Sequence, residues 1–378
     1  MTDDALNAHN LNTDVVYLRR IGKERGFPPR LRRKIWTILL DCESEERPTA
    51  GVILPHQDEK QVLLDTNRSF TMALPHTIEE SQIFGMKIDL QHLIAKVLRN
   101  QPWLHYYQGY HDIAQLFYLV MGNNAGPALE SLSLFYLRDF MLSSLDPSMS
   151  MLRLVHQIVQ VAEPEYAVQL HDVVPYYAIP VLLTWWTHSI ESHDEACRMF
   201  DFLLSSEPVM IIYTIAAATL LRQVEVLKLD GDPDMIFLVL SRGIAGLNLE
   251  ELLRYSTELY RSIKPHQLPY WKNLSIHSCL KTSSEAMLQD GKPVAGPQDE
   301  PLLLQTYAVR AKAHSLHFEA ELKREKESAA LETEKQKQRK NKQEKMSGTE
   351  VKKLSLLALG IGFLAVGIAW FVQHRDPP

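Results

Sequence analysis

The chain has 378 residues, 46% of them hydrophobic and 23% charged, which is the composition of a globular protein long enough to bury a substantial core. Its net charge of −6 excludes the chain as a whole from the strongly basic nucleic-acid-binding proteins. The three cysteines are far apart and form no CxxC or Cys/His metal spacing, which favours free thiols in a reducing compartment.

The main body of the chain has the pattern of an all-α domain. Residues 1–13 are polar and are predicted to be disordered, and residues 14–280 carry amphipathic helical patterns interrupted by Gly, Asn, Asp and Pro. Alternating Val, Ile and Thr runs bounded by turns are nearly absent, so strands are not expected. We therefore predict a multi-helix domain over residues 14–280.

An early helix is predicted after the Pro28-Pro29 pair, since proline is tolerated in a first helical turn. Leu31, Ile35, Trp36 and Leu39 recur at helical spacing and give this helix one apolar face. Arg32 belongs to a basic cluster that, for this helix alone, indicates a solvated face with Trp36 as its anchor.

The next helical pattern covers residues 58–70 and contains Asp65 and Arg68. Residues three apart are neighbours on a helix surface, so these two side chains are expected to pair. Arg68 would lie in the last turn, where the helix dipole favours a cation. Taken alone, the pair is typical of an ordinary surface contact that stabilises a helix by about 0.3 kcal/mol.

The aromatic stretch from Gln101 to Asp112 lies between two long helical patterns and is predicted to be a loop that leads into a helix. Gln108 stands beside Gly109, where a backbone or a ligand can approach closely. A helix N-terminus at this point would suit an anion such as a phosphate. The alternative is that Trp103 and the tyrosines, Tyr106 among them, simply fill a corner of the core.

Further helices are predicted almost without pause as far as residue 263. The segment Ile179–Ile190 is expected to form one helix, and Asn248 is a plausible cap for a helix over Leu249–Ile263. Val209–Leu221 is apolar all round but is too short to cross a bilayer, so it is expected to be a buried core helix.

The C-terminal region changes in character. Residues 281–353 are rich first in Ser, Gly and Pro and then in charge, and are predicted to be a linker or spacer. Its charged part, 319–353, cannot pack a core and is expected to be either a solvated helix or a disordered spacer. Residues 354–373 are uncharged and apolar, and about 19 residues at 1.5 Å rise give about 28 Å, enough to cross a bilayer core. A single C-terminal transmembrane helix is therefore expected, followed by a short tail at 374–378.

Three motifs follow one another in the helical domain: Arg32-xxx-Trp36, Val62-xx-Asp65-xx-Arg68 and Tyr106-x-Gln108-Gly109. Together they resemble the RxxxW, IxxDxxR and YxQ motifs of the TBC domain of Rab GTPase-activating proteins. The resemblance covers residues 26–263, with Val62 in place of the usual Ile. One such motif is weak by itself, whereas the ordered set on an all-α background is specific.

The resemblance implies a role for each motif residue. Arg68 would be an arginine finger and Gln108 a glutamine finger, both acting on GTP in a partner's site. Asp65 would hold Arg68, Tyr106 and Gly109 would position the loop, and Arg32 and Trp36 would be structural. The chain would need no cofactor of its own, since GTP and Mg²⁺ are bound by the Rab, and its sequence contains no metal-binding spacing.

The expected partners are GTP-loaded Rabs, and the resemblance points to those acting between endoplasmic reticulum and Golgi. The basic run before the predicted span places the helical domain in the cytosol, and a short Gly-containing span favours the thin bilayer of the endoplasmic reticulum, with the early Golgi as the alternative. The alternative function is a non-catalytic, membrane-anchored tether that binds Rabs. A hydrolase in its own right finds no support, because GxSxG and P-loop motifs are absent from the sequence.

Overall fold

In the computed structural model, the residues that can be described are 15–42, 54–71, 74, 78–122, 125–275 and 278–281. The chain divides into two units, Met1–Glu319 and Ala320–Pro378, and the second lies wholly outside the described residues. All the helices named below therefore belong to the first unit. The predicted disordered N-terminus and the predicted spacer, span and tail likewise lie outside the described residues.

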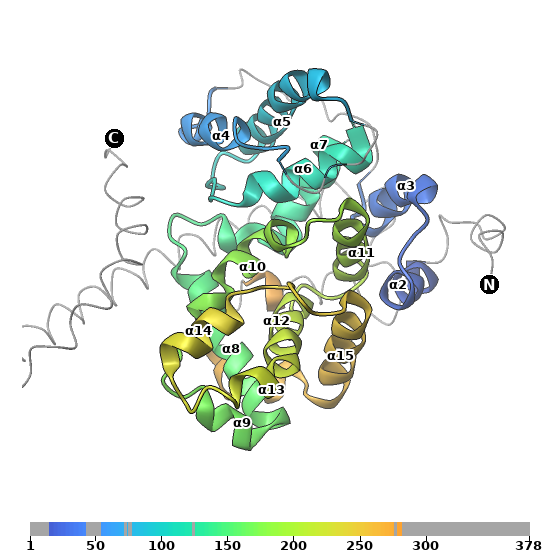
Figure 1. The fold of residues 1–378 in the computed structure, drawn as a ribbon. Helices are drawn as coiled ribbons and strands as arrows, with labels where there is room; N and C mark the ends of the chain where they lie inside the picture. The colour runs from blue at the N-terminus through green and yellow to red at the C-terminus, as the bar shows by residue number, and fades with distance from the viewer. Residues whose placement is uncertain are drawn as a thin grey trace, which may run out of the picture. The chain divides into compact units, whose positions relative to one another are not determined.

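Helices account for all the regular structure of the described residues, which contain no β-strand (Figure 1). The earlier α-helices are α2 (Val15–Glu24), α3 (Pro29–Leu39), α4 (Glu59–Thr66), α5 (Glu80–Asn100), α6 (Tyr110–Met121) and α7 (Ala125–Leu132). The later ones are α8 (Asp146–Ala162), α9 (Pro164–Gln169), α10 (Ile179–Thr184), α11 (His193–Leu204), α12 (Met210–Leu221), α13 (Gln223–Val226), α14 (Pro233–Leu240) and α15 (Leu249–Ser262). The short segments are a π-helix, η2 (Ser133–Leu137), and the 3-10 helices η3 (Arg138–Phe140), η4 (Pro175–Ala178), η5 (Thr187–Ser189), η6 (Pro265–Gln267) and η7 (Pro269–Asn273).

Local signals explain several of these boundaries. Pro233 opens α14 after Asp232, whose side chain accepts hydrogen bonds from two backbone N–H groups of the first turn. Asn248 caps α15 as predicted, because its side-chain oxygen accepts from the N–H of Glu251. Gly26 adopts a φ of 75° just beyond α2, which lets the chain turn into α3.

One predicted helix is broken in the structure. The apolar run Ile179–Ile190 is not continuous as its pattern predicts, because α10 ends at Thr184 and a 3-10 turn begins at Thr187. Trp185 and Trp186 between them have φ values of 48° and 72°, in the left-handed region. Both indole rings are buried, and the Trp186 Nε1–H donates to Thr214 Oγ1 at 2.9 Å. Tertiary packing therefore overrides the local helical pattern.

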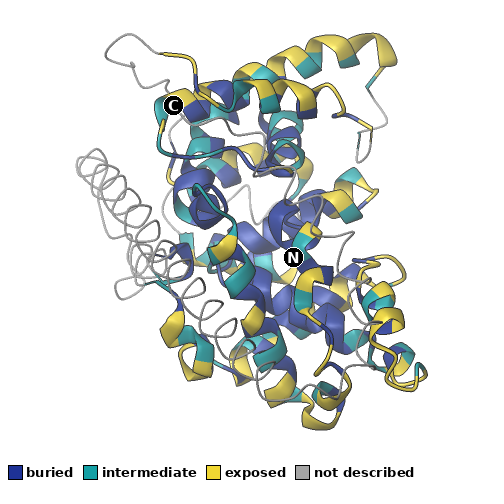
Figure 2. Cartoon of the chain, turned by 90° about the vertical axis from the view of Figure 1, so that its left-hand side faces the viewer, coloured by how far each residue is buried: buried dark blue, intermediate teal, exposed yellow. Residues whose placement is uncertain are grey.

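The core is centred on α12, whose residues from Met210 to Leu220 are all buried, which confirms the prediction of a buried helix. It packs against α8 and α15. Helices α4, α5, α6 and α7 pack on one another in a separate group, which α6 joins to the rest through α3 and α10 (Figure 1). Buried residues lie on the inner faces of the helices and exposed ones on the outer faces (Figure 2).

The carboxylate of Asp201 in α11 fixes the start of the helical domain. It has no exposure to solvent and accepts from Arg32 Nε at 3.1 Å, from Trp36 Nε1 at 2.8 Å and from the Phe27 N–H at 2.9 Å. Burial opposes the charge of Arg32, but its interactions with nearby groups, the Asp201 carboxylate foremost, together outweigh this effect and raise the pKa of the guanidinium. Arg32 and Trp36 thus both hold α3 against α11.

Replacing Asp201 with Ala is expected to lower the free energy of unfolding by about 3–5 kcal/mol, because it leaves a buried guanidinium and an indole N–H without their acceptor. The measurement is urea unfolding of the full chain, followed by circular dichroism. Glu258→Ala is the control, since it breaks the exposed Arg254–Glu258 pair and should cost less than about 1 kcal/mol. Equal midpoints for the two variants would contradict a structural role for the Asp201 carboxylate.

Candidate functional site

Arg68 lies in the turn that follows α4. The prediction that it belongs to the last helical turn is wrong, because α4 ends at Thr66 and the chain turns away at Phe70, which has a φ of 63°. The turn is held from both sides. Lys87 of α5 donates to the carbonyl oxygen of Asn67 at 2.7 Å, and the Phe70 N–H donates to Gln115 Oε1 of α6 at 2.6 Å. The Arg68 side chain nevertheless remains 66% exposed.

Asp65 is the fixed partner of Arg68. Its side chain is fully buried and accepts from Arg68 Nη2, from Gln61 Nε2 at 3.2 Å and from the Tyr106 hydroxyl at 2.8 Å. A buried carboxylate is costly unless it is paired and hydrogen-bonded, and these three donors meet that need. The predicted Asp65–Arg68 pair is therefore present, with one partner buried and the other in solvent.

Tyr106 joins the aromatic loop to this carboxylate. Its backbone N–H donates to Asp58 Oδ2 at 2.9 Å, and its hydroxyl donates to Asp65. Burial and the nearby Asp65 charge raise the pKa of Tyr106 well above its usual value, so the hydroxyl keeps the proton that it donates. Neither contact has a signal in the sequence, because the partners lie 48 and 41 residues away.

Gln108 is an exposed residue in a turn whose geometry depends on the adjacent Gly109. Gly109 has a φ of 109°, and a Cβ atom built there would lie 2.9 Å from the Cγ2 methyl of Thr184. The turn thus requires both the left-handed backbone and the close approach that glycine permits. Gln108 is exposed, and its amide makes no hydrogen bond to the described residues.

The other aromatic residues of the loop pack into the core, as the alternative interpretation expected. Tyr107 is buried and its ring contacts those of Tyr110 and Phe140, with centroid distances of 5.7 and 6.0 Å. Trp103 is partly buried, and its Nε1–H donates to Gln101 Oε1 at 3.0 Å. Core packing therefore accounts for these residues, whereas it does not account for Gln108.

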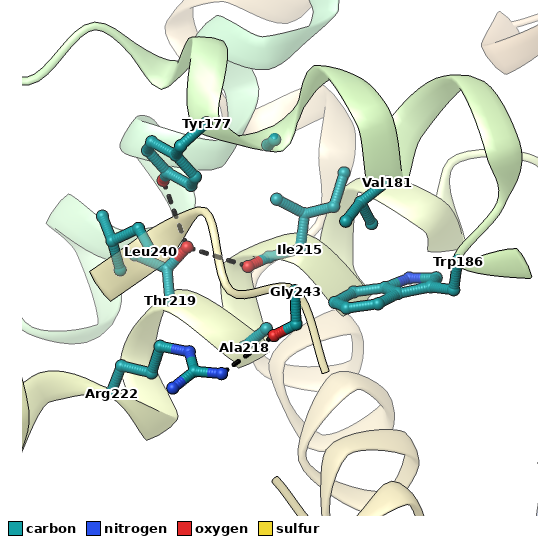
Figure 3. Close-up of a pocket in the computed structure, with 10 residues that line it drawn as sticks. Tyr177, Val181, Trp186, Ile215, Ala218, Thr219, Arg222, Leu240 and Gly243 are labelled. Atoms are coloured by element: carbon teal, nitrogen blue, oxygen red, sulfur yellow. Dashed lines mark hydrogen bonds between the residues drawn. The ribbon is translucent and has the colours of Figure 1, made fainter. Parts of the chain in front are cut away.

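A small pocket lies away from these motifs and does not provide a substrate site. It has room for about one water molecule. Two hydrogen bonds link residues of its lining: the Tyr177 hydroxyl pairs with Thr219 Oγ1 at 3.1 Å, and Arg222 Nη2 donates to the Gly243 carbonyl oxygen at 3.0 Å (Figure 3). The residues that line it are Tyr177, Ala178, Val181, Trp186, Ile215, Ala218, Thr219, Arg222, Leu240 and Gly243.

Metal clusters and membrane-spanning helices are both absent from the part of the chain that the structure describes. No group of three or more His, Cys, Asp or Glu side chains among those residues is arranged to hold a metal ion. Among the same residues no helix is both long and apolar enough to cross a bilayer, and the predicted span at 354–373 is not among them.

Gly109→Ala is expected to lower the free energy of unfolding by about 1–3 kcal/mol, because the left-handed backbone strains an alanine and the new methyl group meets Thr184. The matched control is Gly85→Ala in α5, where nothing lies within 4 Å of the added Cβ atom. That change should instead stabilise the helix by about 0.5–1 kcal/mol. Urea unfolding of both variants checks the opposite signs.

Comparisons with known proteins place this arrangement in a family. The model of the Rab-GTPase-TBC domain matches residues 29–227. The chain is 30% identical over 293 residues to the GTPase-activating protein gyp10 of Schizosaccharomyces pombe, covering 73% of this chain and 76% of gyp10. It is 34% identical over 264 residues to the human TBC1 domain family member 20, covering 68% of this chain and 65% of that protein.

A solved structure, the crystal structure of the Chlamydomonas flagellar RabGAP TBC domain, matches with a TM-score of 0.49 and 15% identity, covering 64% of this chain and 83% of that one. The family follows instead from the sequence matches, since the domain model spans 199 of the 378 residues and contains all three motifs. The chain belongs to the Rab-GTPase-TBC domain family.

Proposed function

We propose that this chain is a GTPase-activating protein that accelerates GTP hydrolysis by a Rab GTPase, with Arg68 and Gln108 supplied in trans to the partner's nucleotide. The names of the relatives that match it support the activity. The single observation that carries the assignment to these residues is the Tyr106–Asp65 hydrogen bond. This bond ties the turn that bears an exposed arginine to the loop that bears an exposed glutamine.

The chemistry of phosphoryl transfer explains why such a pair is useful. Hydrolysis requires neutralisation of the charge that develops on the phosphate oxygens, together with a water molecule aligned for attack on the γ-phosphorus. Arg68 suits the first task, since its planar guanidinium can donate two parallel hydrogen bonds to phosphate oxygens and stays positively charged. Asp65 binds one edge of that group, and most of the side chain remains in solvent.

Gln108 suits the second task. Its side-chain carbonyl can accept from the attacking water while its amide NH₂ donates to the γ-phosphate. Because this amide makes no hydrogen bond to the described residues, no such internal bond has to be broken before it acts. GTP and Mg²⁺ are brought by the Rab, and the chain contributes no cofactor of its own.

We place the full chain at a membrane through residues 354–373, with the helical domain in the cytosol. The uncharged run and the basic residues before it support this topology. The shortness of the run and its glycines favour the endoplasmic reticulum membrane, and Rabs of endoplasmic reticulum to Golgi traffic are the partners we propose.

Arg68→Ala is expected to lower the stimulated rate of GTP hydrolysis by about 10³–10⁵-fold, because it removes the cation that neutralises transition-state charge. Gln108→Ala should also be severe, since it removes the group that aligns the water. Each variant is assayed by phosphate release under single-turnover conditions, with the full chain in detergent and a panel of GTP-loaded Rabs. Circular dichroism should be unchanged for both.

Matched controls exist for both changes. For Arg68 the control is Arg254, which is also exposed and pairs with Glu258 four residues later in α15. For Gln108 the control is Gln160, an exposed glutamine on α8. Arg254→Ala and Gln160→Ala should keep wild-type activity. Near-normal hydrolysis by both motif variants would contradict the mechanism. Rab binding by the wild-type chain without stimulation would instead identify the chain as a tether.

The membrane anchor is tested separately. A fluorescent protein fused to the N-terminus should localise to the endoplasmic reticulum with the intact chain and become cytosolic when residues 354–378 are removed. Phe363→Arg should also release it, since a charge near the centre of the span costs about 2.5–3.5 kcal/mol, whereas Phe363→Leu should not. A cytosolic signal from the intact fusion would rule out the anchor.

A further inference from the structure

His111 lies in the first turn of α6, close behind the paired Asp65 and Arg68. Its Nδ1 atom is 3.0 Å from the Tyr106 hydroxyl oxygen and 3.9 Å from Asp65 Oδ2. Its Nε2 atom is 3.3 Å from Asp112 Oδ1. Only 13% of the His111 side chain is exposed, so it is not itself well placed to reach a partner's nucleotide.

The hydrogen-bond roles in this cluster follow from the number of protons available. The carboxylate of Asp65 is acceptor-only, so the single Tyr106 proton is donated to it. The Tyr106 oxygen can then only accept from His111, which assigns a proton to Nδ1 of that ring. His111 therefore donates to Tyr106, and Tyr106 donates to Asp65.

The other side of the ring faces a carboxylate. Asp112 faces His111 Nε2 through one oxygen and His188 Nδ1, at 3.5 Å, through the other. The Asp112 carboxylate, as an acceptor for the ring N–H of His188, raises the pKa of that histidine, which belongs to η5 after the end of α10. Thr184 of the same corner contacts the position where Gly109 allows close approach. The imidazole of His111 thus lies between the aromatic loop and this corner, hydrogen-bonded to Tyr106.

We propose that His111 is a positioning residue for Arg68, acting through Tyr106 and Asp65. The inference rests on the proposed function and adds a residue to it. Without the Nδ1–H donor, the Tyr106 hydroxyl keeps its hydrogen bond to Asp65 but loses the second hydrogen bond that holds its oxygen in place. Asp65 is then a less well-fixed anchor for a guanidinium that is 66% exposed, and Arg68 spends less time in one orientation. The loss of His111 is therefore expected to slow the chemical step rather than weaken binding of the Rab.

Two substitutions separate this role from simple packing. His111→Leu removes both ring nitrogens and is expected to lower kcat roughly 10-fold to 100-fold, the usual penalty for a misplaced catalytic group, with little change in KM for the GTP-loaded Rab. His111→Asn places an amide N–H near the position of Nδ1 and should restore most of the activity. The full chain is assayed with the Rab that the wild-type chain stimulates.

A double-mutant cycle tests the route of the effect. If His111 acts through Arg68, then His111→Leu should have no further effect on the rate in an Arg68→Ala background. A loss of the same size in both backgrounds would overturn the proposal. So would an unchanged kcat for His111→Leu, or a change confined to KM.

Folding is checked by thermal melting of each variant. Should the leucine variant not fold, His111→Gln keeps polarity but moves the amide one methylene further out, so its kcat should fall several-fold below that of His111→Asn. Equal rates for the two amide variants would overturn the proposal. A wild-type chain that stimulates no Rab would refute the proposed function, whereas an active wild type with an equally active His111→Leu refutes only the role of His111.

Discussion

The buried carboxylate of Asp65 is the constraint on which the candidate site depends. A charge without access to water must be neutralised by fixed donors, and those donors come from α4, from the turn after it and from the aromatic loop. Satisfying this single group therefore brings together segments about forty residues apart in the chain. It also means that the position of Arg68 is set from inside the protein, while its side chain extends outward.

The two motif arginines differ in exposure, and this difference separates the structural role of Arg32 from the reactive role that we propose for Arg68. Arg32 donates hydrogen bonds from Nε and Nη2 to Asp201 and to the carbonyl oxygen of Phe27, and its side chain is only 9% exposed. Arg68 makes one side-chain hydrogen bond, through Nη2 to Asp65, within the described residues. Both pair with a fully buried aspartate. Only Arg68 keeps donors in solvent for a phosphate, which is why we assign the chemistry to it.

The features that depend on neighbouring residues in the chain could be predicted from the sequence. Helical class, the buried helix α12, the prolines that open helices and the Asn248 cap all depend on periodicity or on the adjacent residues. The break at Trp185 was missed, because tertiary packing stabilises left-handed backbone where the local pattern favours a helix. The end of α4 before Arg68 was missed as well. Asp58 and His111 were missed too, since no spacing rule marks a contact between a loop and a distant helix start.

The break at Trp185 lies close to the loop that bears Gln108, and this proximity bears on how freely the loop can move. Gly109 adjoins Gln108, and a Cβ atom at Gly109 would meet the methyl group of Thr184, which directly precedes the two left-handed tryptophans. Left-handed backbone at bulky residues costs free energy and persists only where its surroundings determine it, which here means buried indoles. A corner held in this way has little freedom to move. In the mechanism that we propose, this support would limit the motion of Gln108 although it lies in a turn, so that its exposed amide would be aligned before a Rab binds.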